Sequence, residues 1–205
     1  MLAGRSILAA APDGPIERSP VVFIQTEDTP NPATLKFLPG RAVMTSGSAD
    51  FADASAAEVS PLARRLFDVE NVEGVFLGGD FVSVTKAESG DWRLMKPALL
   101  GVIMEHFISG KPVIEGSAVA AEESFGEDDA EIVSQIKELL ETRVRPAVAN
   151  DGGDIVFRSY DKGIVHLVMQ GACAGCPSST MTLKMGIENL LKHYIPEVVE
   201  VRPVQ

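Results

Sequence analysis

The chain has 205 residues, of which 45% are hydrophobic, and its 18 basic and 29 acidic side chains give a net charge of -11. At about 100–200 residues per domain, this length accommodates one large domain or two small ones. No apolar run reaches the ~18–20 residues that a membrane span needs, and the acidity argues against a nucleic-acid partner. Two cysteines are too few for a disulfide framework in a chain of this length.

Acidic residues are concentrated in one short segment. Residues 118–130 contain five acidic and no basic side chains and lack apolar periodicity, which is typical of a solvated linker. We therefore expect an acidic linker that holds two domains apart, an N-terminal one over 21–117 and a C-terminal one over 131–205. Residues 1–20 match no clean targeting signal, because their apolar run is short and acidic residues follow it. We expect a disordered N-terminal extension there.

Residues 21–117 predict a small α+β domain. Thr29-Pro30-Asn31-Pro32 is turn chemistry between two strand-like runs, and Gly78-Gly79-Asp80 predicts a hairpin. Ser60 followed by Pro61 is typical of a helix N-terminus, with serine as the cap and proline in the first turn. In chain order, the predicted elements are strands over 21–25 and 34–38, a helix over 61–69, strands over 72–77 and 81–85, and a helix over 94–108.

Residues 131–205 predict a second α+β domain. Apolar residues recur at helical spacing over 132–144, and Pro146 is expected near the end of that helix. Turn residues at 150–154 and 161–163 bound a hairpin. The remaining predicted elements are strands over 155–159 and 164–169, a helix over 178–193 and a strand over 198–201. The fold class is therefore α+β, with two small domains, the C-terminal one ordered α-β-β-α-β around a three-stranded sheet.

The two cysteines, Cys173 and Cys176, lie in the loop GACAGCPSST between a predicted strand and a predicted helix. Pro177 followed by hydroxyl residues indicates a helix start, which places Cys176 at the positive end of the helix. That position favours a thiolate over a thiol. No charged residue occurs over 163–183, and the small neighbours allow another chain or an inorganic group to come close.

This CxxC motif has four possible interpretations. One is that the two thiols have no role, and the other three assign them a chemical function. A dithiol–disulfide redox site is one, although a single helix and a short strand after the motif are too little for a thioredoxin-like sheet. A structural zinc needs four ligands, and His106, His166 and His193 stand at no recognisable spacing from the cysteines. An iron–sulfur cluster normally takes four cysteine thiolates, so two chains meeting at this loop would supply the set.

Other residues near the motif have ordinary structural interpretations. Asp151-Gly152-Gly153-Asp154 is expected to form a left-handed turn capped by its aspartates rather than to hold a metal. Met169, Met181 and Met185 are expected to fill the core rather than to act as ligands. His166 is expected to be a half-exposed strand residue. No catalytic triad, phosphate-binding glycine loop or paired carboxylates indicate an enzyme.

The motifs resemble a known family. DGGDI, a hairpin and then GACAGCPSSTMTLKMGIE are similar to the C-terminal domain of NifU, which the Nfu iron–sulfur carriers share. FIQTEDTPNPATLKFLPG and DWRLMKP resemble the N-terminal domain of mitochondrial and alphaproteobacterial Nfu proteins. Together the two resemblances cover roughly residues 21–203.

The resemblance implies a scaffold or carrier, not an enzyme, that binds a [4Fe-4S] cluster between two subunits and transfers it to apo-proteins. The family's cluster ligands correspond to Cys173 and Cys176. The implied partners are a second copy through the C-terminal domain, recipient apo iron–sulfur proteins and upstream cluster-assembly proteins. The implied compartment is the cytoplasm in a bacterium or the mitochondrial matrix in a eukaryote. A [2Fe-2S] cluster also takes four thiolates and stays open, and the alternative function is a dithiol–disulfide oxidoreductase.

Overall fold

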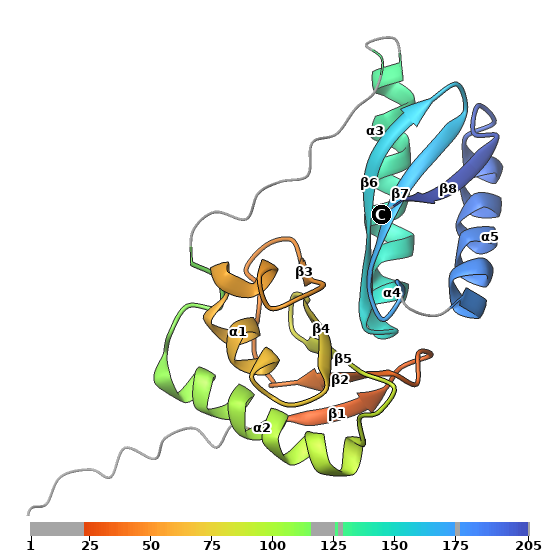
Figure 1. Ribbon diagram of the computed structural model, residues 1–205. Helices are drawn as coiled ribbons and strands as arrows, with labels where there is room; N and C mark the ends of the chain where they lie inside the picture. The colour runs from red at the N-terminus through yellow and green to blue at the C-terminus, as the bar shows by residue number, and fades with distance from the viewer. Residues whose placement is uncertain (1–22, 116–125, 127–128, 175–176, 205) are drawn as a thin grey trace, which may run out of the picture.

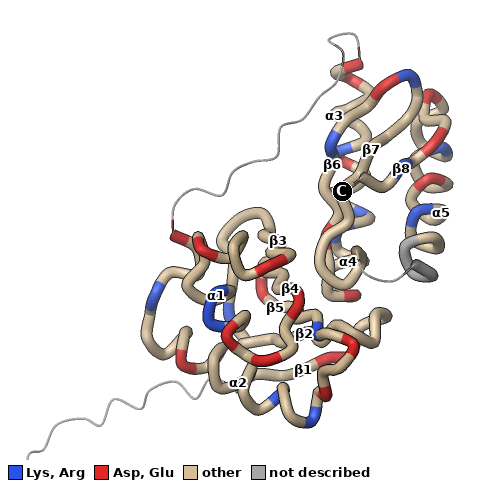
Figure 2. The backbone as a smooth tube through the Cα atoms, in the orientation of Figure 1, with Lys and Arg blue, Asp and Glu red and all other residues tan. Residues whose placement is uncertain are grey.

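The computed structural model describes residues 23–115, 126, 129–174 and 177–204. Two sheets, each with its own hydrophobic cluster, divide these residues into an N-terminal unit (23–115) and a C-terminal unit (129–204). Both units mix helices with a sheet, which confirms the predicted α+β class (Figure 1). Acidic and basic side chains occur on both units (Figure 2), so the charge of the described residues is not confined to one element.

The N-terminal unit is an antiparallel sheet covered on one face by helices (Figure 1). The strand order is β1-β2-β5-β4-β3. Its elements are β1 Gln25–Asp28, β2 Thr34–Leu38, β3 Ala49–Phe51, the 3-10 helix η1 Ala56–Val59, α1 Pro61–Phe67, β4 Val72–Leu77, β5 Val82–Lys86 and α2 Trp92–Ser109. The core side chains come from alternate strand positions such as Phe37, Val75 and Val84, together with Leu62 and Leu99 of the helices.

The sequence predicted most of these elements, with two differences. Ser60 caps α1 as expected, because its side chain accepts a hydrogen bond from the Ala63 N–H. The predicted strand over 21–25 is wrong, since the strand covers Gln25–Asp28 instead, in antiparallel register with β2, and residues 21 and 22 lie outside the described range. The short edge strand β3 was not predicted.

The C-terminal unit is a three-stranded sheet in the order β6-β7-β8. Its elements are α3 Ala130–Leu139, the π-helical turn η3 Leu140–Val144, α4 Arg145–Asn150, β6 Gly153–Asp161, β7 Ile164–Gly171, α5 Pro177–Tyr194 and β8 Glu200–Val204. The hairpin β6–β7 is antiparallel, and β8 returns parallel to β7 after the crossover helix α5. This is the predicted α-β-β-α-β order.

The first helix of this unit does not end near Pro146, so that prediction is wrong. Pro146 stands in the first turn of α4, where a missing backbone N–H costs little, and the chain stays helical to Asn150. The π-helical turn η3 lies immediately before it. Because the helix continues past Pro146, Arg145 lies close to the start of β6, where it contacts Asp154.

The two units are in contact rather than held apart. The open end of the β6–β7 hairpin, where β6 begins and β7 ends, packs on the face of the N-terminal sheet that α1 and α2 do not cover (Figure 1). Among the described residues, side chains of Lys36, Ser48, Asp50 and Ser83 form hydrogen bonds to the C-terminal unit. Most of the predicted linker, residues 118–130, lies outside the described residues. The composition of the linker could not predict this contact, because it carries no information about which surfaces of the two units fit together.

Candidate functional site

Cys173 lies in the turn that follows β7 and precedes α5. Its side chain belongs to the hydrophobic cluster of the C-terminal unit, and only 5% of its surface is exposed. Cys176 lies outside the described residues, so its predicted position is not tested; α5 begins at Pro177, the next residue in the chain. The structure therefore brings the first cysteine to the sheet edge in a buried position.

Two glycines shape the backbone around Cys173. Gly171 ends β7 with a φ of 61°, a left-handed conformation that side chains disfavour. Gly153, its partner in the β6–β7 register, has no room for a side chain. An added Cβ there would lie 2.6 Å from the Cys173 Sγ and 2.5 Å from the Gln170 carbonyl oxygen. The thiol is therefore pressed against the backbone at the start of β6.

The electrostatic surroundings of Cys173 differ from the prediction of a site without nearby charge. Burial, together with the smaller effect of the negative charges of Asp151 and Asp154, raises the pKa of the Cys173 thiol to about 12. The thiol is consequently protonated at neutral pH. The absence of charge over 163–183 was misleading, because Asp151 in the turn before β6 and Asp154 at the start of β6 both lie near the cysteine loop.

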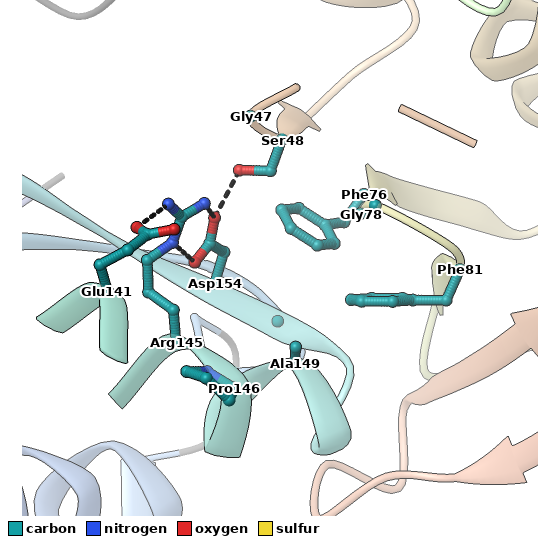
Figure 3. Close-up of a pocket in the computed structure, with 12 residues that line it drawn as sticks. Gly47, Ser48, Phe76, Gly78, Phe81, Glu141, Arg145, Pro146, Ala149 and Asp154 are labelled. Carbon is teal, nitrogen blue, oxygen red and sulfur yellow. Dashed lines mark hydrogen bonds and ion pairs between the residues drawn. The ribbon is translucent and has the colours of Figure 1, made fainter. Parts of the chain in front are cut away.

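Asp154 is the centre of a hydrogen-bond network rather than a simple turn cap, which corrects the interpretation of its role (Figure 3). Arg145 of α4 donates from Nε at 2.8 Å and from Nη2 at 2.7 Å to the two carboxylate oxygens. The Ile155 N–H donates to the same carboxylate, which is only 5% exposed as a residue. Arg145 also pairs with Glu141, and these partners raise its pKa. The turn at 151–154 does contain a left-handed Gly152, as expected.

A cavity of about 230 Å³ lies between the two units beside this network (Figure 3). The N-terminal unit contributes the rings of Phe76 and Phe81, and the C-terminal unit contributes Arg145 and Asp154. Ser48 extends from the N-terminal unit and donates a hydrogen bond to the Asp154 Oδ2 at 2.7 Å. Four polar side chains that line this cavity, Ser48, Glu141, Arg145 and Asp154, form hydrogen bonds with one another.

The predictions for other residues near the motif are partly confirmed. His166 is half-buried in β7 and contacts the Ser159 hydroxyl through Nδ1 at 3.1 Å. Met169 is buried in the core, but Met181 and Met185 are 61% and 58% exposed, so the core interpretation is wrong for these two. They lie four residues apart and hence on one face of α5.

His106 was singled out only as an unsuitable zinc ligand, and the structure gives it a different environment. It is fully buried within α2, and neither ring nitrogen has a hydrogen-bond partner. Burial lowers its pKa, and the positive charges of Arg65 and Lys111 lower it further. Among the described residues, no group of three or more His, Cys, Asp or Glu side chains is arranged to hold a metal ion. Within the same residues, no helix is both long and apolar enough to span a membrane.

Comparison with protein families matches both units. The family described as "Scaffold protein Nfu/NifU N terminal" matches residues 24–110, and the family described as "NifU-like domain" matches residues 136–202. A solved structure of a NifU-like protein from Saccharomyces cerevisiae is similar over 57% of this chain and 100% of that chain, with 22% identity and a TM-score of 0.44.

Full-length relatives are much closer in sequence. A Drosophila virilis protein named "NFU1 iron-sulfur cluster scaffold homolog, mitochondrial" is 56% identical over 184 residues, which are 89% of this chain and 62% of that protein. The protein of the same name from Drosophila sechellia is 51% identical over 203 residues, 98% of this chain and 71% of the relative. The chain thus spans less than two thirds of the first of these relatives.

Proposed function

Because the chain belongs to the Nfu family of iron–sulfur cluster scaffold proteins, we propose that it carries an iron–sulfur cluster and passes it to apo-proteins. The cluster is cargo, so the protein acts as a scaffold and not as an enzyme. The observation that carries the proposal is the position of Cys173, at a strand-to-helix turn followed three residues later by the only other cysteine of the chain.

The proposed ligands are the thiolates of Cys173 and Cys176. A [4Fe-4S] cluster takes four thiolates, and each chain contains two cysteines. Two chains must therefore meet at this loop to complete the set. A [2Fe-2S] cluster has the same requirement, so the iron and sulfide content decides between the two.

The described conformation of Cys173 has a direct consequence for loading. The thiol is buried, and its pKa of about 12 keeps it protonated, whereas a metal ligand must be a thiolate. Loading therefore requires the loop to turn the sulfur outward and releases a proton. A cluster shared by two chains is retained only while the chains associate, so dilution favours its release to an acceptor that offers more thiolates.

In the described conformation the burial of Cys173 and its raised pKa count against both functions alike, so the names of the relatives, and not these observations, favour the scaffold over a dithiol–disulfide oxidoreductase. A redox-active cysteine is partly exposed and has a lowered pKa. Cys173 is buried, and its pKa is raised. The proposed partners are a second copy of the chain, upstream cluster-assembly proteins and recipient apo-proteins. The names of the relatives support the mitochondrial matrix rather than the bacterial cytoplasm as the compartment.

Anaerobic reconstitution with iron and sulfide tests the proposal. We expect a visible chromophore, four irons and four sulfides per dimer, and a holo-protein with twice the mass of the chain. Two irons and two sulfides per dimer would assign a [2Fe-2S] cluster instead. Reduction of insulin disulfides without any chromophore would favour the oxidoreductase and contradict the scaffold.

Single substitutions test the ligand assignment. Cys173→Ser and Cys176→Ser should each abolish cluster retention and leave the far-ultraviolet circular dichroism unchanged. Ser159→Ala, which removes a hydroxyl at a distance in β6, is the matched control and should retain the full iron content. A full cluster in either cysteine variant would refute the assignment.

A further inference from the structure

One row of side chains crosses four of the five strands of the N-terminal sheet, from β2 to β3, on its open face. The register pairs Lys36 of β2 with Ser83 of β5, Ser83 with Phe76 of β4, and Phe76 with Asp50 of β3. Side chains alternate between the faces of a strand, so these four point away from the face that packs on α1 and α2. None of the four belongs to the N-terminal hydrophobic cluster. We call Lys36, Ser83, Phe76 and Asp50 the docking row.

Two members of the docking row contact the segment that leads from α4 into β6. The Lys36 Nζ donates to the Asn150 carbonyl at 3.3 Å, and the Ser83 Oγ donates to the Gly152 carbonyl at 2.7 Å. Lys36 is 5% exposed and Ser83 is 1% exposed, although both lie on the face without helices. The C-terminal unit therefore covers the centre of this face.

The other two members contact the end of β7. A Cβ added at Gly171 would lie 2.8 Å from the Phe76 ring, and the Asp50 carboxylate accepts a hydrogen bond from the Gly171 N–H. Gly171 stands two residues before Cys173. The docking row thus contacts both backbone segments that enclose the thiol, the start of β6 and the end of β7.

We propose that the docking row holds the chain in a closed state that prevents a second copy from reaching the cysteine loop, and that the row releases when two C-terminal units share a cluster. The inference rests on the proposed function. A bridging cluster needs room at the cysteine loop for a second C-terminal unit. The Cys173 sulfur lies against Gly153 of its own unit, and the docking row covers the neighbouring backbone at Gly152 and Gly171 from the other side. Docking and bridging therefore use the same end of the β6–β7 hairpin.

The chemistry of the contact suits reversible docking. It consists mainly of hydrogen bonds to backbone carbonyls and N–H groups, each of modest net strength because water replaces the partner on separation. Contacts between domains of one chain resemble transient protein interfaces. The chain from Glu115 to Asp129 could reach up to roughly 50 Å if fully extended, so the covalent connection does not prevent separation.

Amine labelling of Lys36 measures docking directly in the full-length chain. Lys36 is 5% exposed in the docked state, where its Nζ reaches the Asn150 carbonyl of the other unit, and release should expose it further. The exposed Lys111 in the same unit serves as the internal reference. Mass spectrometry after brief acetylation gives the ratio of the acetylated fraction of Lys36 to that of Lys111. Ser83→Lys places a long side chain at a position that is 1% exposed and closely packed against Gly152, so it has no room while the units are docked. Ser89→Lys makes the same change at an exposed site whose hydroxyl bonds Asn71 within the N-terminal unit.

We expect Ser83→Lys to raise the Lys36:Lys111 labelling ratio roughly tenfold, the factor that loss of one or two hydrogen bonds produces, and Ser89→Lys to leave it unchanged. Reconstituted wild-type protein should show a similar rise, and Ser83→Lys should load iron faster than wild type. Ser83→Ala, which cannot disturb the strand, should shift the ratio in the same direction by a smaller factor.

Two results separate this proposal from the proposed function. A protein that contains its full iron and sulfide while Lys36 stays protected would overturn release of the row and leave the scaffold function standing. Failure of wild type and all variants to form a cluster would overturn the function and the release together. Equal labelling ratios for Ser83→Lys and wild type, with native circular dichroism in both, would overturn the docking row itself.

Discussion

The Ser83 hydroxyl, in the middle of the N-terminal sheet, donates a 2.7 Å hydrogen bond to the carbonyl of Gly152 in the C-terminal unit. Both partners are shielded from water, since Ser83 is 1% exposed. A buried hydroxyl that lost this acceptor would have to find another or leave the interior. The contact therefore links the orientation of the two units to the turn that lies against Cys173.

Gly153→Ala should destabilise the C-terminal unit. The added Cβ would lie within 2.6 Å of both the Cys173 Sγ and the Gln170 carbonyl oxygen, so the backbone must shift. Overpacking of this kind costs about 1–3 kcal/mol. Urea unfolding measures the loss. Gly186→Ala is the control, because nothing lies within 4 Å of its Cβ position in α5 and alanine favours a helix. Equal stability of the two variants would contradict the close approach.

Asp154→Asn should weaken the network that joins α4, β6 and the N-terminal unit. Asparagine keeps the shape but removes the charge that Arg145 and Ser48 contact. A loss of about 1–3 kcal/mol in the free energy of unfolding is expected, because Asp154 is buried. Glu141→Gln removes the charge of the exposed partner of Arg145 and should cost less than ~1 kcal/mol. If Glu141→Gln lowered the free energy of unfolding more than Asp154→Asn, Glu141 and not Asp154 would be the more important partner of Arg145.

His106 should make the N-terminal unit sensitive to acid. Its pKa in the folded chain is lowered by burial from the ordinary 6.5, so the unfolded chain binds the proton more readily. Stability is therefore full above pH 6.5 and falls as the pH drops below that value. Tm measured from pH 7.5 to pH 5 should decrease in wild type, and His106→Leu should remove part of that decrease. Parallel pH profiles for the two proteins would contradict this role of His106.

Asp50 should give docking the opposite pH dependence. Asp50 as a residue is exposed, but protein around its carboxylate removes part of its hydration, and this desolvation raises the pKa from 3.8 to about 6. A group with a raised pKa favours the buried state while protonated, so docking weakens as the pH rises from about 4 through 6. Lys36 labelling cannot follow this change, because amine reactivity depends on pH. The radius of gyration from solution scattering should be smaller at pH 5 than at pH 7.5, and Asp50→Asn should remove the difference.

The elements with local signals were predictable from sequence. Ser60 and Pro61 mark the start of α1, and the Asp161-Lys162-Gly163 turn supplies two positive φ angles between β6 and β7. The three-residue strand β3 has no such signal, because its pairing with β4 and not its composition defines it. Pro146 misled the prediction of the helix end, since proline stops a helix in its interior but is tolerated in a first turn.

The place of Cys173 between a strand and a helix was predictable from the sequence, whereas its environment was not. The CxxC spacing, the helix start and the stoichiometric argument all derive from adjacent residues. The burial of Cys173 and the charges of Asp151 and Asp154 beside it depend on a turn about twenty residues earlier. The docking row escaped detection for the same reason, because its four residues are separated in the chain and adjacent only in the register of the sheet.

The paired glycines Gly153 and Gly171 leave the last rung of the β6–β7 hairpin without side chains. The Cys173 sulfur approaches this rung at Gly153, and the Phe76 ring approaches it at Gly171. Only one layer of backbone therefore separates a thiol of one unit from an aromatic ring of the other. Because no side chain lies between them, the backbone at this rung would pass a displacement of the Phe76 ring directly to the Cys173 sulfur, even one of a few tenths of an ångström.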